Sequence, residues 1–516
     1  MRLHPRVWEM LRSRRTKIIL ACSPFILALL VALAYPVSTW LGRRSLEQFV
    51  ESMHDQGYVT NAAAYFSPSG PAEENYFLHP AALAEQEKSG SIVKALRYFE
   101  PPLPGISRRL ETGEPALARR ADLRTWLTPP LADEAGTARH LLAAIEPSSR
   151  RLDELREALK RPRAEWPLDD GLDASTEAIE KIVRSQFRLR PVADFAADEA
   201  YLYLALGDSE RAAADLGAML ECNRLYLSSK PTVVALLLHE ALSRGTTRLI
   251  WEGIARSSWN EAQLASFEAA LARENPQSAL IQAFHGEAAL LEIWAAKVGS
   301  LESHDQGANL LKGWDPDLDR IQQRLRGIWR ELRPLGFVLS KHVQSQRALF
   351  GEMTLPDGTA RQRFEPEDLA RFRSTLDSLP QAIVTSESGA THTSRDIDAE
   401  AWGMLRSLST TVLRAEATIA LARTGIALER YRLQHGIHPA SLQELVPAYL
   451  PSVLLDPFTR RPLHYRVQAD GSPQVWSIGA NLTDEGGLPK RDRDQGDLVW
   501  ITRPIPGYTE KEFRKP

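Results

Sequence analysis

The motif in this sequence that comes nearest to a catalytic one is His239-Glu240-Ala241-Leu242-Ser243. A helical zinc site of the His-Glu-x-x-His type needs a second histidine at the fifth position, because two imidazoles one turn apart hold the metal. Ser243 occupies that position, so the site lacks a ligand. We therefore interpret His239 as a helical histidine that stands beside an exposed Glu240.

Other catalytic signatures are absent from the sequence. His285 and Glu287 form a similar pair, but the Cys-x-x-Cys that a zinc deaminase requires does not accompany them. There is no Gly-x-Ser-x-Gly elbow, no Walker loop and no Gly-x-Gly-x-x-Gly. Cys222 has no basic motif beside it, and we expect it to fill a helix interface. The sequence assigns no catalytic residue, although a site assembled from distant residues leaves no local signature.

Composition excludes several classes of protein. The chain has 516 residues, of which 43% are hydrophobic and 25% charged, and these proportions exclude wholesale disorder and collagen-like repeats. Its 63 Lys and Arg against 66 Asp and Glu give a formal net charge of −3, so no overall field attracts nucleic acid and no such partner is expected. Two cysteines exclude a disulfide framework. The length predicts about three or four domains.

An uncharged segment near the N-terminus predicts a membrane anchor. Residues 18–42 contain no charged side chain, and roughly 20 helical residues cross a bilayer core of about 30 Å. We predict a basic cytoplasmic tail over residues 1–17 and a transmembrane helix over residues 18–41, which makes the lipid bilayer a partner.

The charges around this segment predict its orientation. The tail carries an excess of Arg and Lys, so the positive-inside rule leaves the N-terminus in the cytoplasm and exports the body. A composition rich in arginine and alanine indicates a bacterium. The expected location is therefore the bacterial inner membrane, single-pass, with a periplasmic body. The alternative is an export signal that is cleaved after Ala32-Leu33-Ala34.

The exported body is predicted to be mainly helical. Prolines break residues 45–150 into what we expect to be short helices and extended segments. Residues 165–350 form a predicted α-helical domain, either a bundle or a solenoid, in which Asn260 and Gln263 cap one helix. Further helices are expected at 231–243, 245–257, 278–298 and 315–350. Within this domain one stretch resembles a single tetratricopeptide hairpin and implies an antiparallel helix pair, on the residues Tyr203, Gly207, Asp208, Ala212 and Leu216.

The C-terminal part begins with a long predicted helix. Apolar residues recur there at alternating steps of three and four: Leu405, Leu408, Val412, Ala415, Ile419, Ala422 and Ile426. This stripe packs either on the helix's own domain or in an intermolecular coiled coil. Gly436 is suited to end the helix, and Ser441 with Glu444 forms a capping box for a short second helix.

After this helix the sequence period becomes that of strands. Residues 463–467 and 474–478 flank Asp470-Gly471, which predicts a hairpin, and residues 498–501 supply a third strand. The loop before the third strand is rich in glycine and acids. A small α+β module with a three-stranded antiparallel sheet is therefore expected.

The order of these features resembles a known family. A helix ending in Gly436-Ile437-His438-Pro439 is followed by Asp456-Pro457-Phe458, Pro462-Leu463-His464-Tyr465-Arg466, Trp476-Ser477-Ile478-Gly479-Ala480-Asn481 and Asp497-Leu498-Val499-Trp500. Residues 400–502 are similar to the globular part of the type II secretion major pseudopilin, in which a helix runs into a three-stranded antiparallel sheet. Residues 503–516 remain as a tail.

The rest of the chain resembles large membrane-anchored bacterial envelope proteins of unassigned function that end in this module. One departure is that the anchor has no prepilin-peptidase site, so assembly into a pilus by the usual route is not expected.

The resemblance implies a calcium site in the loop before the last strand, with Asn481, Asp484 and Asp497 as candidate metal ligands. Such a flexible loop of hard oxygen donors suits calcium. Against it, Asn481 replaces an acid and three basic residues lie inside the loop. The alternative is a loop closed by turns and hydrogen bonds alone.

Three functions follow from these observations. The first is a non-enzymatic membrane-anchored envelope scaffold that presents the pseudopilin-like module to other proteins. The second is an accessory component of a type II secretion-like or pilus-like assembly, whose partners are envelope or secretion-system proteins. The third is an envelope hydrolase whose site is assembled from scattered residues.

Overall fold

The computed structural model of the protein describes residues 37, 40–87, 115–127, 129–165, 182, 185–228, 230–290, 394–490 and 495–514. The predicted tail over 1–17, nearly all of the predicted anchor over 18–41 and the expected helix at 315–350 lie outside these ranges. Within them, no helix combines the length and the apolar character that crossing a bilayer requires.

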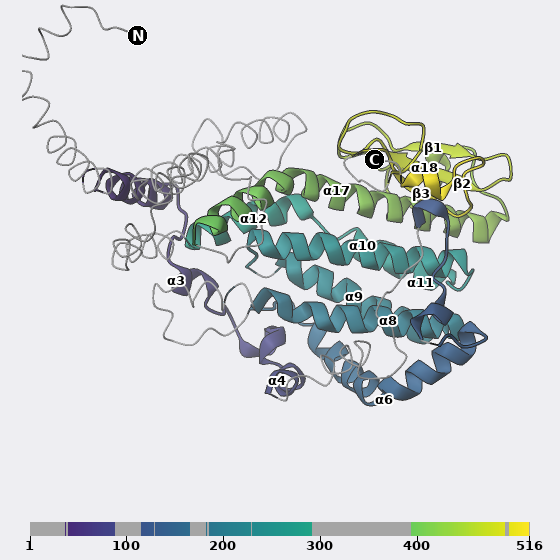
Figure 1. Cartoon of the computed structure of the whole chain (residues 1–516), viewed down its shortest axis with the longest axis horizontal. Helices are drawn as coiled ribbons and strands as arrows, with labels where there is room; N and C mark the ends of the chain where they lie inside the picture. The colour runs from purple at the N-terminus through teal and green to yellow at the C-terminus, as the bar shows by residue number, and fades with distance from the viewer. Residues whose placement is uncertain are drawn as a thin grey trace, which may run out of the picture.

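The described part of the chain is mainly helical, with one small antiparallel sheet near the C-terminus, as the sequence predicted. The helices α6, α8, α9 and α10 pack on one another in chain order; α11 packs on α9, α12 packs on α10, and α17 returns to pack on α10, α11 and α12 (Figure 1). Their bounds are α6 Glu134–Leu159, α8 Arg190–Leu206, α9 Ser209–Ser228, α10 Val233–Ala255, α11 Glu261–Leu271, α12 Pro276–Ala289 and α17 Ser394–His435.

The predicted helix pair is confirmed as α8 and α9, which pack on each other. Gly207 ends α8 with a φ of 76°, a left-handed conformation that glycine adopts without steric strain. The capping box that begins α11 is also confirmed, because Gln263 N donates to Asn260 Oδ1 at 2.9 Å and Asn260 N donates to Gln263 Oε1 at 3.0 Å.

Helix α10 corrects one prediction. The two helices expected at 231–243 and 245–257 form a single helix over Val233–Ala255. Gly245 does not interrupt it, because a glycine inside a helix lowers helix stability by only about 1 kcal/mol relative to alanine. The helix also contains no proline. The buried Thr246 hydroxyl donates to Leu242 O at 3.0 Å, so the polar residues after Gly245 are satisfied within the helix.

The region before α8 holds short elements and one long helix. A helix covers residues 40–55. Helix α6 has 26 residues, begins at the cap Asp133 and continues through Pro147. The prediction that proline breaks this whole region into short pieces is therefore wrong for α6, whose buried apolar residues on both sides of Pro147 hold it together. The short elements are α3 Ala62–Phe66, η1 Ala72–Glu74, η2 Tyr76–Leu78, α4 Pro80–Glu87, η3 Pro115–Leu117 and η4 Leu123–Trp126.

The sheet follows α17 and has the strand order β1-β2-β3, with both pairs antiparallel. Val475 of β2 lies between Tyr465 of β1 and Trp500 of β3. Gly436, with a φ of 78°, follows the end of α17, and the capping box of Ser441 and Glu444 begins η6. The bounds are η6 Leu442–Leu445, β1 His464–Val467, β2 Pro473–Ser477, β3 Leu498–Ile501 and α18 Glu510–Phe513.

Helix α17 joins the sheet to the helical body. The described members of its apolar stripe are all buried, and the helix contacts α10, α11 and α12 as well as β2 and β3. The stripe thus packs within the chain. Gly425 permits close packing, since a Cβ there would lie 2.2 Å from Trp500 Cε2. Trp251 Nε1 of α10 also donates to Ile501 O of β3 at 2.6 Å, so body and sheet share one hydrophobic core.

Candidate functional site

The acidic loop before β3 lies on the sheet. Trp476 Nε1 donates to Asp484 Oδ1 at 3.0 Å, and Gln474 Nε2 donates to Gly487 O at 2.7 Å. Gly487 has a φ of 78°, and a Cβ at this position would lie 2.4 Å from Gln474 Nε2. The loop therefore covers the face of β2 that points away from α17, and every residue of β2 is buried.

Asp497 is the buried acid of this loop, with 3% of its surface exposed. Its Oδ2 accepts hydrogen bonds from Gly487 N at 2.7 Å and Leu488 N at 3.2 Å. Burial raises the pKa of Asp497 to about 7; the Gly487 hydrogen bond opposes this rise, and the nearby Glu485 carboxyl adds to it.

The other two predicted ligands are engaged differently. Asp484 Oδ1 accepts from Trp476 Nε1 and from Gly486 N at 2.8 Å, which directs this carboxylate towards the sheet. Asn481 Nδ2 donates to Glu485 Oε1 at 2.7 Å, while its Oδ1 accepts from Thr483 N at 3.2 Å. Asn481 is therefore linked to Glu485 and, through it, to Asp497.

The structure thus brings together Asn481, Glu485 and Asp497 and leaves Asp484 apart. The sequence-based prediction missed Glu485. The signal that could have identified it as a candidate ligand is its position directly before two glycines in the acidic loop. The Glu485 carboxyl is buried at its Oε2 and lies beside the Asp497 carboxyl, and two adjacent carboxyl groups suit a hard cation. Within the described ranges, however, no three His, Cys, Asp or Glu side chains are grouped to hold a metal. Calcium stays a prediction, with Glu485 and Asp497 as the carboxylates that would hold it.

The raised pKa of Asp497 predicts a pH dependence. The folded pKa of about 7 exceeds the unfolded value of about 4, so the stability that this group contributes is complete below about pH 4 and is lost as the pH rises through 7. Without calcium, we expect the melting temperature of the wild type to fall by about one or two degrees more than that of Asp497→Asn between pH 6 and 8, measured by circular dichroism. Equal slopes for the two proteins would contradict this prediction.

Calcium would reverse this slope, since the cation stabilises the ionised carboxylates. At pH 8 we expect added calcium to raise the melting temperature of the wild type and of Asp484→Asn, but not of Glu485→Gln or Asp497→Asn. Asp484→Asn is the matched control, because it removes an acid of the same loop that lies outside the group. A titration that leaves the wild type unchanged would remove the calcium hypothesis.

The histidine of the first motif has a structural role. His239 has only 1% of its side chain exposed, and its Nε2 lies 2.8 Å from Glu274 Oε2 and 3.2 Å from Ser243 Oγ. A Ser-His-acid relay needs the serine and the acid on opposite ring nitrogens, whereas both contact Nε2 here. Glu240 was expected to be exposed, but it is 7% exposed and lies 3.0 Å from Arg244, which shields it.

The second pair and the described cysteine also contribute to packing. Glu287 Oε1 accepts from Val233 N at 3.0 Å, and burial raises the pKa of Glu287. The His285 ring lies 4.6 Å from that of Tyr58, and burial lowers the pKa of His285. Cys222 is fully buried in the helical core, as predicted, and burial raises the pKa of its thiol, which disfavours the reactive thiolate.

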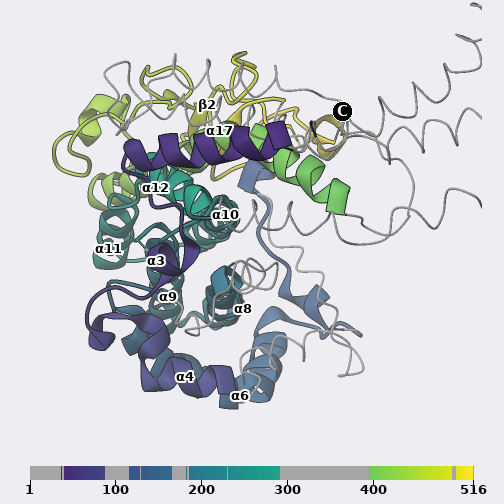
Figure 2. The same cartoon turned by 90° about the vertical axis from the view of Figure 1, so that its left-hand side faces the viewer.

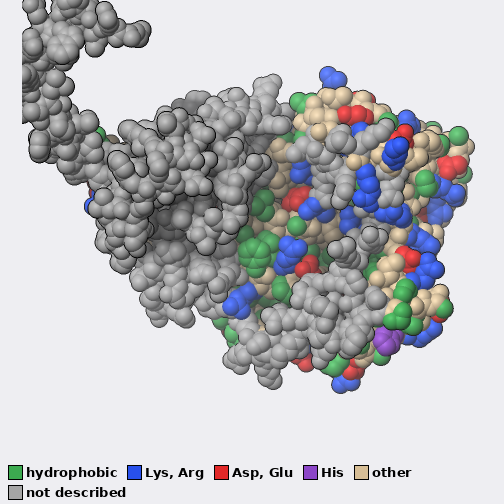
Figure 3. All heavy atoms as spheres, viewed as in Figure 1, with side chains coloured by type: hydrophobic (Ala, Val, Ile, Leu, Met, Phe, Trp, Pro, Cys, Tyr) green, Lys and Arg blue, Asp and Glu red, His purple; other side chains and the backbone are tan. Residues whose placement is uncertain are grey.

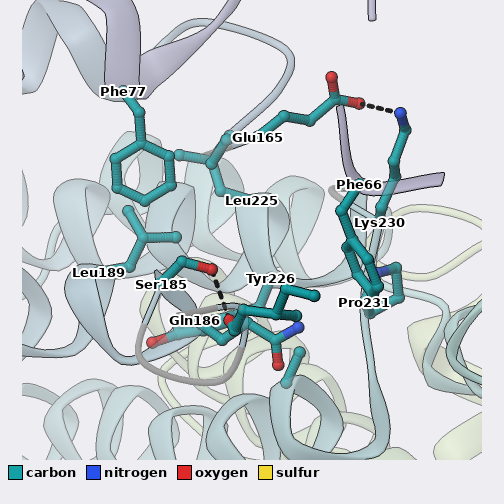
Figure 4. A pocket seen from close by; sticks show the side chains of 13 residues that line it. Phe66, Phe77, Glu165, Ser185, Gln186, Leu189, Leu225, Tyr226, Lys230 and Pro231 are labelled. Atoms are coloured by element: carbon teal, nitrogen blue, oxygen red, sulfur yellow. Dashed lines mark hydrogen bonds and ion pairs between the residues drawn. The ribbon is translucent and has the colours of Figure 1, made fainter. Parts of the chain in front are cut away.

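A cavity between α3, α9 and the start of α10 is mainly apolar (Figure 4). Phe66 and Pro231 lie on one side of it and Phe77 on the other, and Lys230 Nζ lies 3.9 Å from Glu165 Oε1 at the edge. Its volume of about 50 Å³ admits a few water-sized molecules. This space is too small for most organic substrates.

Comparisons of the chain with protein-family models, with curated proteins and with solved structures each found no match.

Proposed function

We propose that this protein is a non-enzymatic envelope scaffold, anchored in the bacterial inner membrane by residues 18–41, which presents its pseudopilin-like C-terminal module to other periplasmic proteins. One observation carries the proposal: the sheet and the helical body share a single core through Trp251 and α17. A module held in this way cannot swing independently, so the body fixes its position and orientation.

The start of the described chain supports the anchor. Val37, Trp40 and Leu41 are each more than half exposed, and Arg44 lies 5.3 Å from the Trp40 ring. An exposed tryptophan beside apolar and basic residues suits the interface between a bilayer and water. The helix over 40–55 would therefore leave the membrane at this end.

The same helix is packed firmly on the body. Leu46, Phe49 and Met53 are buried together with residues of α12 and with Val412 of α17, and Figure 2 shows the helix lying against these elements. It lies at one end of the molecule and the sheet at the other (Figure 1). An anchor at residues 18–41 would thus hold the module away from the bilayer, where partners can reach it.

A second candidate function is that of an accessory component in a type II secretion-like assembly. Strand β1 pairs only with β2 among the described strands, so its other edge is open, and Arg466 and Val467 on it are exposed. An open strand edge can take a strand from another chain. The proposed partners in this case are the pseudopilins themselves.

Membrane fractionation tests the anchor. We expect the full-length chain in the inner-membrane fraction, with its body digested by protease in spheroplasts but not in intact cells. A variant whose residues 1–41 are replaced by a cleavable export signal should appear in the soluble periplasm. A wild-type product shortened by about 34 residues would contradict the anchor.

Site-specific crosslinking tests the presentation of the module. A photoreactive residue at Arg466, on the open strand, should give adducts with envelope proteins in cells. The matched control is the same residue at Arg150, which is exposed on α6 of the body. Secretion subunits among the adducts would favour the second candidate, and equal adducts at both positions would contradict the scaffold proposal.

A further inference from the structure

A polar cleft lies beside the sheet, at the end of the molecule opposite the helix over 40–55. It is formed by the segment that follows η3, the start of α6, the end of α10 and the residue after β3. Its volume is about 470 Å³, and its polar lining includes Arg119, Arg120, Asp122, Arg124, Glu134 and Thr502. We call it the arginine cleft. Figure 3 shows several Lys and Arg side chains, with Asp and Glu side chains among them, on the described part of this face.

The segment that carries the arginines is held rigidly. Ala121 N donates to Glu252 Oε2 at 3.1 Å, and Ala121 O accepts from Arg256 Nη2 at 3.2 Å. Leu123 and Trp126, which follow, are almost completely buried. The backbone directly after Arg119 and Arg120 is therefore fixed to the body, which positions these two arginines.

The acids of the cleft are paired with arginines, although Glu134 and Glu252 share one of them, Arg256. Asp122 accepts two hydrogen bonds from Arg124, Nε to Oδ1 at 2.9 Å and Nη2 to Oδ2 at 2.7 Å. Glu134 Oε2 lies 3.0 Å from Arg256 Nη1. The same arginine also contacts Glu252 Oε1 through its Nε. Among the described residues, the four arginines Arg119, Arg120, Arg124 and Arg256 thus stand against the three acids Asp122, Glu134 and Glu252, which leaves a net charge of one positive unit.

Arg120 is the arginine of this set that lacks a partner among the described residues. It is exposed, and within the described ranges it forms no hydrogen bond or ion pair, acting on Glu252 only through its charge. A guanidinium presents parallel N–H groups whose geometry matches two oxygens of a carboxylate or phosphate. A free guanidinium over a cleft of ligand size is therefore suited to an anion.

We propose that the arginine cleft binds a small oxyanion, a phosphate or carboxylate group, with Arg120 as its principal contact. The binding itself does not depend on the proposed scaffold function. The source of the anion does depend on the scaffold function. If residues 18–41 anchor the chain, the cleft lies away from that bilayer, and the anion comes from a soluble molecule. Because the cleft is open to solvent, we expect binding to weaken as the ionic strength rises.

Isothermal titration of the purified full-length protein with sodium phosphate and with sodium citrate, at low ionic strength, tests the proposal. We expect saturable binding of at least one probe, and the preferred probe identifies the group. Arg120→Ala should weaken binding by tenfold or more. Arg120→Lys, which keeps the charge but removes the paired N–H groups, should bind less well than the wild type.

The matched control is Arg150→Ala, which removes an exposed arginine of α6 and should leave binding unchanged. The proposal is overturned if neither probe binds, if Arg120→Ala binds as well as the wild type, or if the protein binds anionic phosphatidylglycerol vesicles but no free ion. This test does not use membrane fractionation. A failure of the anion-binding proposal can therefore be distinguished from a failure of the scaffold proposal.

Discussion

Replacing Trp251 by alanine is expected to lower the free energy of unfolding by about 3–5 kcal/mol, the range measured when a large buried aromatic side chain is removed. Trp251 is fully buried in the core that joins α10 to β3. The change also removes the donor for Ile501 O, and an unpaired buried carbonyl adds about 1–3 kcal/mol. Body and sheet should lose stability together, because both contact this side chain.

Urea denaturation followed by circular dichroism measures this effect. Trp251→Phe, which keeps most of the apolar volume but not the hydrogen bond, should be less destabilising. Trp40→Ala is the matched control, since this tryptophan is 55% exposed and should change stability by about 0.5 kcal/mol or less. Separate unfolding transitions for the body and the sheet in the wild type would contradict a shared core.

Replacing Asp456 by alanine is expected to lower the free energy of unfolding by at least about 3 kcal/mol. Asp456 is fully buried; its Oδ1 accepts from Phe458 N and Ser477 Oγ at 2.9 Å each, and its Oδ2 accepts from Ile478 N at 3.0 Å. Alanine leaves all three donors unpaired, and each buried unpaired group costs about 1–3 kcal/mol. The turn before β1 and the end of β2 would lose their common anchor.

Thermal denaturation and hydrogen exchange at the Ile478 amide measure this loss. Asp470→Ala is the matched control, because Asp470 also accepts from a backbone N–H and a serine hydroxyl, Ser472 N at 3.0 Å and Ser472 Oγ at 2.6 Å, but is exposed. Water can replace its hydrogen bonds, so its loss should cost under about 1.5 kcal/mol. Equal effects of the two changes would mean that burial of Asp456 contributes nothing.

Several elements could be predicted from the sequence because their signals act over one helical turn or one strand. Asn260 with Gln263, and Ser441 with Glu444, bond to the backbone three residues away, so the same short stretch contains the whole interaction. The buried positions of α17 follow from the spacing of its apolar side chains. The hairpin between β1 and β2 likewise follows from Asp470-Gly471 and the alternation on both sides of it.

Predictions failed where a local signal was outweighed by packing. The break expected between residues 243 and 245 is absent from α10, whose faces are buried, and α6 is one long helix although short pieces were expected over residues 45–150. Glu240 was expected to be exposed, but its partner Arg244, one helical turn away, lies close enough to allow burial. In the two helices, many contacts from other elements exceed the small preference of one residue.

By itself, the sequence determined the helical character of the body, the helix ends and the three strands of the sheet. Only the tertiary structure decided that Trp251 meets Ile501 across 250 residues, that Glu485 rather than Asp484 accompanies Asp497, and that Arg120 stands free over a cleft. The physical reason is the distance along the chain over which each kind of interaction acts. Caps and alternation depend on neighbours a few residues away, whereas burial and the approach of distant charges depend on how all the helices pack together.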